Sequence, residues 1–317
     1  MALDHFVSQV HLKRFNSPAL GDRFHAIRKC DLKHFTPNSK SVCRIEEGNT
    51  NPYLIEQRAI EDFLRDIEPK YNRATESMFA DEIDAETIHT IAGFVAYVLA
   101  CSPAAMRHHS TWLALYVEQF TLEMDKRGAF PPAPRSLGNR TLTDLITNGD
   151  LEIEIDPKYP QSMGIDQILQ QTHIFGNALW HILRNDNFDA PFFTSDFPIA
   201  TIRTSGPAAT RLIPLCPTLA VSITPIPAMV RSKPDLTYKG FKRTIQNLKR
   251  QEAVNINRQI VRAAESEVYF SHLMPWVDRF VQANANFRTE IIASAGVAAG
   301  RSYVHALTEI RPYTWER

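Results

Sequence analysis

The sequence contains few cysteines. Its four, Cys30, Cys43, Cys101 and Cys216, lie far apart and form no Cys-x-x-Cys pair. A disulfide-stabilised scaffold of this length would normally use more cysteines, so we expect a reducing compartment and a cytoplasmic location. Each cysteine is then best interpreted as a small buried hydrophobic residue.

Long apolar segments and an excess of either charge are also missing. The longest apolar run, residues 91–101, is about half the ~20 residues that span a bilayer, which predicts a buried helix and no membrane partner. Residues 1–12 have no apolar core, so we expect no signal peptide. Basic and acidic residues both number 35. This zero balance argues against a protein that coats nucleic acid or membrane with its whole surface.

Common catalytic motifs are absent. The sequence has no G-x-x-x-x-G-K-[ST], G-x-G-x-x-G, G-x-S-x-G or H-E-x-x-H, which argues against nucleotide-driven phosphoryl transfer, Rossmann redox chemistry and the common lipase fold. What is present is enough apolar material for a core, since 44% of the residues are hydrophobic. The 12 glycines and 20 prolines exclude collagen-like repeats.

Apolar spacing predicts a mainly helical chain. Helices are expected over residues 53–78, 86–100, 103–124, 165–183, 238–270 and 276–287. Short β-branched runs bounded by turn residues predict strands over residues 23–32, 41–45, 191–202, 211–215 and 219–224. The expected fold class is therefore α+β, predominantly helical with a small antiparallel or mixed sheet.

A proline-rich segment is the best internal boundary. Pro131-Pro132-Ala133-Pro134 predicts a rigid surface connection. It separates residues 1–130, a basic extended region followed by helices, from residues 135–317, with a helix, a small sheet and long helices. We expect the two parts to form one integrated domain.

Polar residues that suit chemistry gather in two segments. The N-terminal segment reads His5-Phe6-Val7-Ser8-Gln9-Val10-His11-Leu12-Lys13-Arg14-Phe15, and a helical turn there would place His5 and Gln9 on one face. The second segment reads Thr194-Ser195-Asp196-Phe197-Pro198. It follows Trp180 and precedes Asn255, Asn257, Tyr269 and Ser271.

In this order the motifs resemble the bacterial family catalogued as domain of unknown function 4238. Its members open with His-x-Val-Pro-Gln-x-x-Leu-x-x-Phe and carry a tryptophan before a Thr-Ser-Asp-x-Pro strand end, then a late helix with an asparagine. The resemblance extends from His5 to Ser271, with two departures: Ser8 replaces the usual proline, and His11 lies where an aromatic residue is common. It implies site positions but no established activity.

The candidate catalytic residues are His5, Asp196, Gln9 and Asn257. His5 could act as a general base or a metal ligand, and Asp196, at a predicted strand end, could orient it or share a divalent metal ion. Gln9 and Asn257 could position a substrate oxygen. The alternative is structural: Asp196 would cap its own turn, and His5 would be a buried, capped histidine.

A basic stripe is the candidate contact for phosphates. Nine bases against two acids lie between positions 231 and 262, and most of those on the expected helix over 238–270 fall outside its apolar stripe. We assign phosphate contacts to Arg14, Lys242, Arg243, Lys249 and Arg250. The alternative is a solvated face that pairs with the acidic region at residues 45–90.

The remaining histidines are weaker candidates. His108 and His109 are adjacent, so they point in different directions on a helix and are expected to be solvent-exposed. His173 and His181 would share a helical face and could bind a metal, although satisfied core histidines are the better interpretation.

These observations favour a metal-assisted or acid/base hydrolase that acts on a phosphodiester, a nuclease-like enzyme with nucleic acid as its partner. The alternative is a non-enzymatic protein that binds a small ligand, a nucleic acid or a protein segment. Tightly held metal would favour the first, and salt-sensitive binding without turnover would favour the second.

Overall fold

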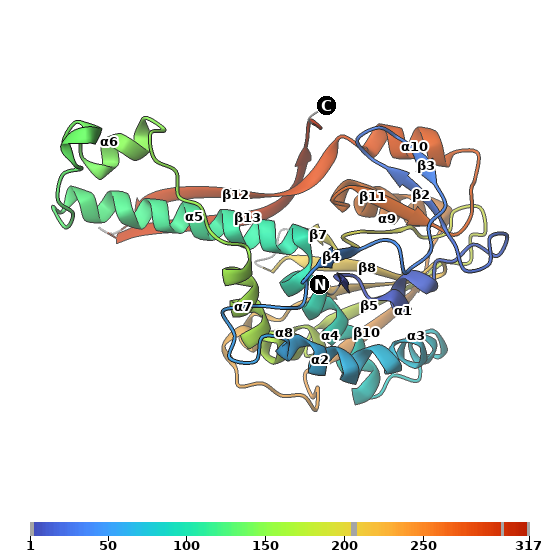
Figure 1. The fold of residues 1–317 in the computed structure, drawn as a ribbon. Coiled ribbons are helices and arrows are strands. Elements are labelled where there is room, and N and C mark those ends of the chain that lie inside the picture. Colours follow the sequence, from blue (N-terminus) through green and yellow to red (C-terminus); the bar gives the residue numbers. More distant parts are fainter. Residues whose placement is uncertain (1–2, 204–207, 299–300, 316–317) are drawn as a thin grey trace.

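The computed structural model describes residues 3–203, 208–298 and 301–315. Figure 1 shows a body of helices packed around β-sheets, with a long arm that projects from one side. One hydrophobic core extends from Val7 near the N-terminus to Tyr269 in the C-terminal part. It therefore contains residues from both sides of the proline-rich segment at 131–134, which lies on the arm.

A five-stranded sheet occupies the body. The strand order is β10-β5-β9-β8-β7, and all neighbours are antiparallel except β10 and β5, which are parallel. Trp180 and Ile182 are fully buried, while His181 between them is not. This alternation places one face of β5 in the core. The strands are β5 (Leu179–Arg184), β7 (Ala200–Ile202), β8 (Thr210–Cys216), β9 (Leu219–Thr224) and β10 (Lys242–Asn247).

A second sheet joins segments that are distant in the sequence. Its order is β3-β2-β11-β6, and Tyr269 of the inner strand β11 pairs with Ala26 on one side and Thr194 on the other. A separate antiparallel pair, β1 with β4, holds the first residues described. The strands are β1 (Leu3–His5), β2 (His25–Arg28), β3 (His34–Phe35), β4 (Arg44–Glu46), β6 (Thr194–Ser195) and β11 (Glu267–Phe270).

Helix α4 is the central helix of the body. Nearly all of its residues are buried, and the carboxylate of Asp84 caps it by accepting a hydrogen bond from the Thr87 amide at 2.7 Å. It packs against α2, α3 and α8. Outside the arm the helices are α1 (Gln9–Lys13), α2 (Ala59–Ile67), α3 (Tyr71–Ala80), α4 (Ala85–Cys101), α7 (Lys158–Asp166), α8 (Ile168–Gly176), α9 (Arg250–Ala263) and α10 (Val277–Asn284). Single 3-10 turns cover Glu68–Lys70, Arg135–Leu137 and Pro227–Arg231.

The arm consists of α5 (Pro103–Lys126), α6 (Leu142–Thr147) and the hairpin of β12 (Phe287–Ala298) and β13 (Arg301–Pro312). Helix α5 lies along both strands of the hairpin (Figure 1). Ser102 caps this helix by accepting the Ala105 amide at 3.2 Å, and Pro103 begins its first turn, where a missing N–H costs nothing.

Several expected helices are wrong, and the fold is mixed α and β with more strand than expected. The segment 238–270 is not one helix but β10, α9 and β11. The expected helix over 165–183 ends at Gly176, and residues 179–183 belong to β5. The expected helix over 53–78 begins only at Ala59 and is interrupted by the 3-10 segment Glu68–Lys70, which contains Pro69. In each case strand pairing or proline overrides an apolar spacing that also fits a helix.

No single helix in the described part of the chain is long and apolar enough to cross a membrane. Only the pair Ala59–Ala80 and Ala85–Cys101, bent by 116°, meets the length and composition criteria when its halves are taken together.

The end of α8 gives a test of the packing. A Cβ atom at Gly176 would lie 2.2 Å from Cε1 of the buried Tyr238, so Gly176→Ala should lower the free energy of unfolding by about 1–3 kcal/mol. The measurement is urea denaturation. Gly21→Ala is the comparison, because nothing lies within 4 Å of that position and only its positive φ is strained, a cost of about 1 kcal/mol. Equal losses in both variants would contradict the close approach.

Candidate ligand-binding site

His5 and Gln9 do not lie on one helix. His5 ends strand β1, and Gln9 begins α1, so the shared helical face expected from the sequence is wrong. Nε2 of His5 lies 3.0 Å from the carbonyl oxygen of Ser39, and the hydroxyl of Tyr97 donates to the carbonyl oxygen of His5. Burial lowers the pKa of His5, which keeps the imidazole neutral at physiological pH.

Asp196 does not cap its own turn, as the structural alternative expected, but the turn at residues 265–267 that leads into β11. Its carboxylate accepts hydrogen bonds from the backbone amides of Glu265, Ser266 and Glu267 at 2.8–3.1 Å. Burial raises the pKa of Asp196, and the ammonium group of Lys29 acts in the opposite direction. This carboxylate therefore fixes the start of β11 beside β6.

Asn257 also has a clear role in the fold. Its amide oxygen accepts from the Phe193 backbone at 2.9 Å, and its nitrogen donates to the Pro191 carbonyl at 2.8 Å, so it holds α9 against the segment before β6. In the described part of the chain, His5 and Asp196 share no hydrogen-bond partner. Among the described residues there is no group of three or more His, Cys, Asp or Glu side chains that could hold a metal ion.

The predicted phosphate contacts do not lie on one helix face. Lys242 and Arg243 belong to the exposed edge strand β10, and Lys249 and Arg250 lie at the start of α9. Arg243 pairs with Asp81 at 2.8 Å and Arg250 with Asp189 at 2.5 Å. Arg14 lies elsewhere, with its guanidinium 3.2 Å from Asn72 and 3.7 Å from Glu76. The contact with Asp81 agrees with the alternative that these bases pair with the acidic region at 45–90.

His11 is the most connected residue of the N-terminal segment. The ring is completely buried and stacks on Phe94; Nδ1 lies 2.7 Å from the hydroxyl of Tyr71 and Nε2 lies 2.8 Å from that of Thr194. It thus joins α1, α3, α4 and β6 at one point. Desolvation lowers the pKa of His11 to about 3. Sequence reasoning treated this residue only as a departure from the family motif.

The other histidines agree with expectation only in part. His108 is buried, not solvent-exposed, and burial lowers its pKa to about 4, so it is neutral and donates from Nε2 to the Thr289 carbonyl at 2.8 Å. His173 lies in α8 and His181 in β5, so they share no helical face. His173 is a satisfied core histidine, since Nδ1 accepts from the Asp235 amide and Nε2 contacts the Ser232 hydroxyl.

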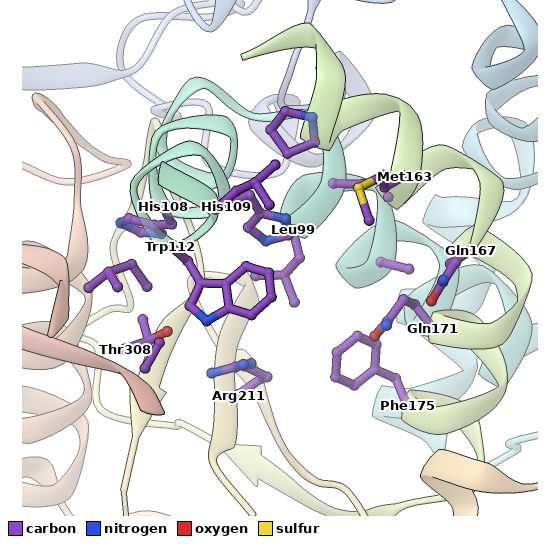
Figure 2. Close-up of a pocket in the computed structure, with 17 residues that line it drawn as sticks. Leu99, His108, His109, Trp112, Met163, Gln167, Gln171, Phe175, Arg211 and Thr308 are labelled. Carbon is purple, nitrogen blue, oxygen red and sulfur yellow. The ribbon is translucent and has the colours of Figure 1, made fainter. Parts of the chain in front are cut away.

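A pocket of about 460 Å³ lies where the arm meets the body. Its volume is in the range of small-molecule sites. Figure 2 shows the indole of Trp112 across the pocket, Arg211 below it, and Phe175 with Gln167 and Gln171 on the opposite wall. The lining comes from α4, α5, α7, α8, β8 and the arm hairpin. Most of the lining is apolar, so its few polar side chains determine which polar groups a ligand can present.

Arg211 is the charged group of this pocket. It extends from β8, is half-buried and donates through Nη1 to the Thr201 hydroxyl at 2.6 Å. Its Nε is buried and has no hydrogen-bond partner, and no carboxylate pairs with it among the described residues. Burial, followed by the positive charge of Arg203, lowers the pKa of Arg211 to about 10. The guanidinium therefore stays charged at neutral pH without a counter-charge.

His109 lies close to this cation. It also lines the pocket, and desolvation together with the charge of Arg211 lowers its pKa. Arg203 contacts the carbonyl oxygen of Thr308, another lining residue, at 3.4 Å. The polar end of the pocket thus carries positive charge and hydrogen-bond donors, an arrangement that suits an anion.

The arm side of the pocket is held by a charged cluster. The guanidinium of Arg107 makes two hydrogen bonds of 3.0 Å to the carboxylate of Glu265, one of 2.8 Å to Glu290 and one of 2.9 Å to the Thr289 carbonyl. Lys29 donates to the carbonyl oxygens of Ala264 and Phe287. Because these bonds anchor the root of β12 to α5 and α9, they fix the wall that carries Ile291.

Sequence reasoning missed this pocket. Arg211 was noted only as the first residue of an expected strand, and Trp112, Gln167 and Gln171 only as parts of expected helices. The available signal was local: Arg211 is the only charged residue between positions 204 and 230. A charge inside an otherwise apolar strand is costly unless it is paired or binds a ligand.

The buried His11 predicts acid sensitivity. Desolvation lowers the pKa of His11 to about 3 in the folded protein, against 6.5 for an imidazole in water. The unfolded chain therefore binds a proton between those values, and stability falls as the pH drops below 6.5. His11→Gln should reduce this pH slope by up to about 1.4 kcal/mol per pH unit. Urea denaturation at pH 7, 6 and 5 measures it, with the exposed His305→Gln as control. Equal slopes in wild type and His11→Gln would contradict the buried neutral imidazole.

Asp196→Ala should destabilise the protein strongly. The change leaves three backbone amides without an acceptor and removes one of the two negative charges near Lys29. We expect a loss of about 3–5 kcal/mol in the free energy of unfolding. Asp189→Ala, which removes the partner of Arg250 in an exposed ion pair, should cost less than about 1 kcal/mol. Chemical denaturation compares the two. A fully stable Asp196→Ala protein would show that the carboxylate is not needed for the fold.

Comparison with known proteins gives one match. The model of the family described as "Protein of unknown function (DUF4238)" matches residues 4–272. No curated protein and no solved structure matches the chain. The matched region includes His5, His11, Asp196 and Asn257 and ends before the arm hairpin. Because the match covers most of the sequence, the chain belongs to the DUF4238 family.

Proposed function

We propose that this protein binds a small organic anion in the pocket between the arm and the body. The observation that carries the proposal is Arg211, a partly desolvated guanidinium that faces a mostly apolar pocket with no carboxylate partner among the described residues. Leaving a charge in this state costs stability, and a bound anion would offset the cost. Its apolar part would cover Trp112 and Phe175.

Other arginines with an unpartnered buried Nε differ from Arg211. Arg14 lies 3.7 Å from the carboxylate of Glu76. The guanidinium of Arg184 lies over the ring of Phe79 and donates to its carbonyl oxygen. Both are therefore compensated from within the chain, whereas Arg211 has only the Thr201 hydroxyl among the residues that the structure describes. The difference favours a ligand at Arg211.

The nuclease-like hydrolase stays a prediction. It required His5 and Asp196 to act together. In the structure His5 contacts the Ser39 carbonyl and Asp196 accepts from the Glu265 amide, so the two side chains are engaged in different parts of the fold. It also required a continuous basic helix, but the bases lie on an edge strand and a helix start, and two of them are paired with acids. No observation favours it over the binding function.

Arg211→Gln tests the proposal. Charge-assisted hydrogen bonds contribute about 1.5–3 kcal/mol each, so the variant should bind phenyl phosphate about 10- to 100-fold more weakly by isothermal titration calorimetry. Because the substitution removes an uncompensated charge, the melting temperature of the ligand-free protein should stay the same or rise.

The matched control is Arg258→Gln, on the exposed face of α9. It should leave both the affinity for phenyl phosphate and the melting temperature unchanged. Two results would contradict the proposal. One is that neither phenyl phosphate nor benzoate binds the wild-type protein saturably; the other is that Arg211→Gln unfolds at a lower temperature, as expected of a structural arginine.

A further inference from the structure

Two amides stand on the pocket wall opposite His109. Gln167 and Gln171 are one helical turn apart at the start of α8, and both line the pocket (Figure 2). The structure gives no hydrogen-bond partner to either side chain among the residues it describes. Neighbouring glutamines are engaged: Gln161 donates to the Gly48 carbonyl at 2.9 Å and Gln170 to the Ser232 carbonyl at 3.2 Å.

This pair limits the chemistry of a ligand. Each amide presents two donors and one acceptor, so a group that displaces water from both must itself offer donors and acceptors side by side. A hydrocarbon chain or an unsubstituted phenyl ring would leave the amides without partners. The edge of a nucleobase has the required alternation, and glutamine is a common reader of such edges.

Flat surfaces lie beside the amides. The indole of Trp112 is 38% exposed, and its ring stacks on Tyr116 with centroids 5.8 Å apart and planes inclined by 22°. This stack holds the indole in the orientation seen in Figure 2, with the ring of Phe175 across the pocket. Aromatic side chains are the usual platforms for bases.

We propose that the anion is a free nucleoside monophosphate, with its base between Trp112 and Phe175, its edge at Gln167 and Gln171, and its phosphate at Arg211. This assignment rests on the proposed function of the pocket and adds the class of ligand. A simple organic acid accounts for the uncompensated cation and the open aromatic surface, but it leaves the two free amides unexplained, and a nucleoside monophosphate accounts for all three features. The volume of about 460 Å³ leaves room for a sugar between the two ends.

The test uses calorimetric titrations of the full chain with AMP, GMP, CMP, UMP, adenosine and phenyl phosphate. At least one monophosphate should bind 10-fold or more tightly than phenyl phosphate, which has the anion and the ring but no hydrogen-bonding edge. Adenosine should bind at least 10-fold more weakly than AMP, because it lacks the anion.

Variants assign the parts of the site. Gln167→Ala combined with Gln171→Ala should bring the best monophosphate to the affinity of phenyl phosphate and leave phenyl phosphate binding unchanged. Gln170→Ala, on the same helix but bonded to Ser232, should change neither. Arg211→Gln should weaken both ligands by a similar factor.

The outcomes separate this inference from the function on which it rests. If phenyl phosphate binds as tightly as every monophosphate, or if the double glutamine variant keeps the preference, the nucleotide assignment is overturned and the anion site stands. If no anion binds, the proposed function itself fails. If a 5′-phosphorylated tetranucleotide binds more tightly than any monophosphate, the recognised group is the end of a nucleic acid, and the free-ligand assignment is overturned.

Discussion

The contact of His11 with Tyr71 and Thr194 fixes how remote parts of this chain meet. A polar group that loses water must find its partners inside the protein, and this imidazole finds both, one on α3 and one on β6. Asp196 and Asn257 follow the same rule with backbone partners. Each of the three residues joins segments at least 60 residues apart in the sequence. Together they fix the positions of the N-terminal segment, α3, α9 and the strands β6 and β11 relative to one another.

The family motifs and the pocket have different roles. Side chains of the motifs, such as His11, Asp196 and Asn257, form hydrogen bonds between distant segments and so stabilise the fold. The pocket is lined by residues outside those motifs. Part of its wall, Ile291, Ala306 and Thr308, comes from the arm hairpin, which lies beyond the residues that the family model matches. The pocket therefore combines walls from the part of the chain that the family model matches with a wall from the arm hairpin.

How much the sequence could predict depends on whether local signals decided the structure. Helix α5 begins at Pro103 as expected because Ser102 and the proline mark its start, and β9 was predicted with its observed bounds, Leu219–Thr224. The polar strand β10 was missed because only its pairing with β5 makes it a strand. The pocket was missed for a related reason: Trp112, Gln171 and Arg211 converge only through tertiary packing, and no motif spacing connects them.

The central claim is that Arg211 receives an anion whose ring lies against Trp112. The most direct measurement is a crystal structure of the protein soaked with 4-bromophenyl phosphate, in which anomalous scattering locates the bromine. The account predicts phosphate density within hydrogen-bond distance of the Arg211 guanidinium and a bromine peak between Trp112 and Phe175. An empty pocket with Arg211 paired to a carboxylate of this chain or of a second copy would contradict it.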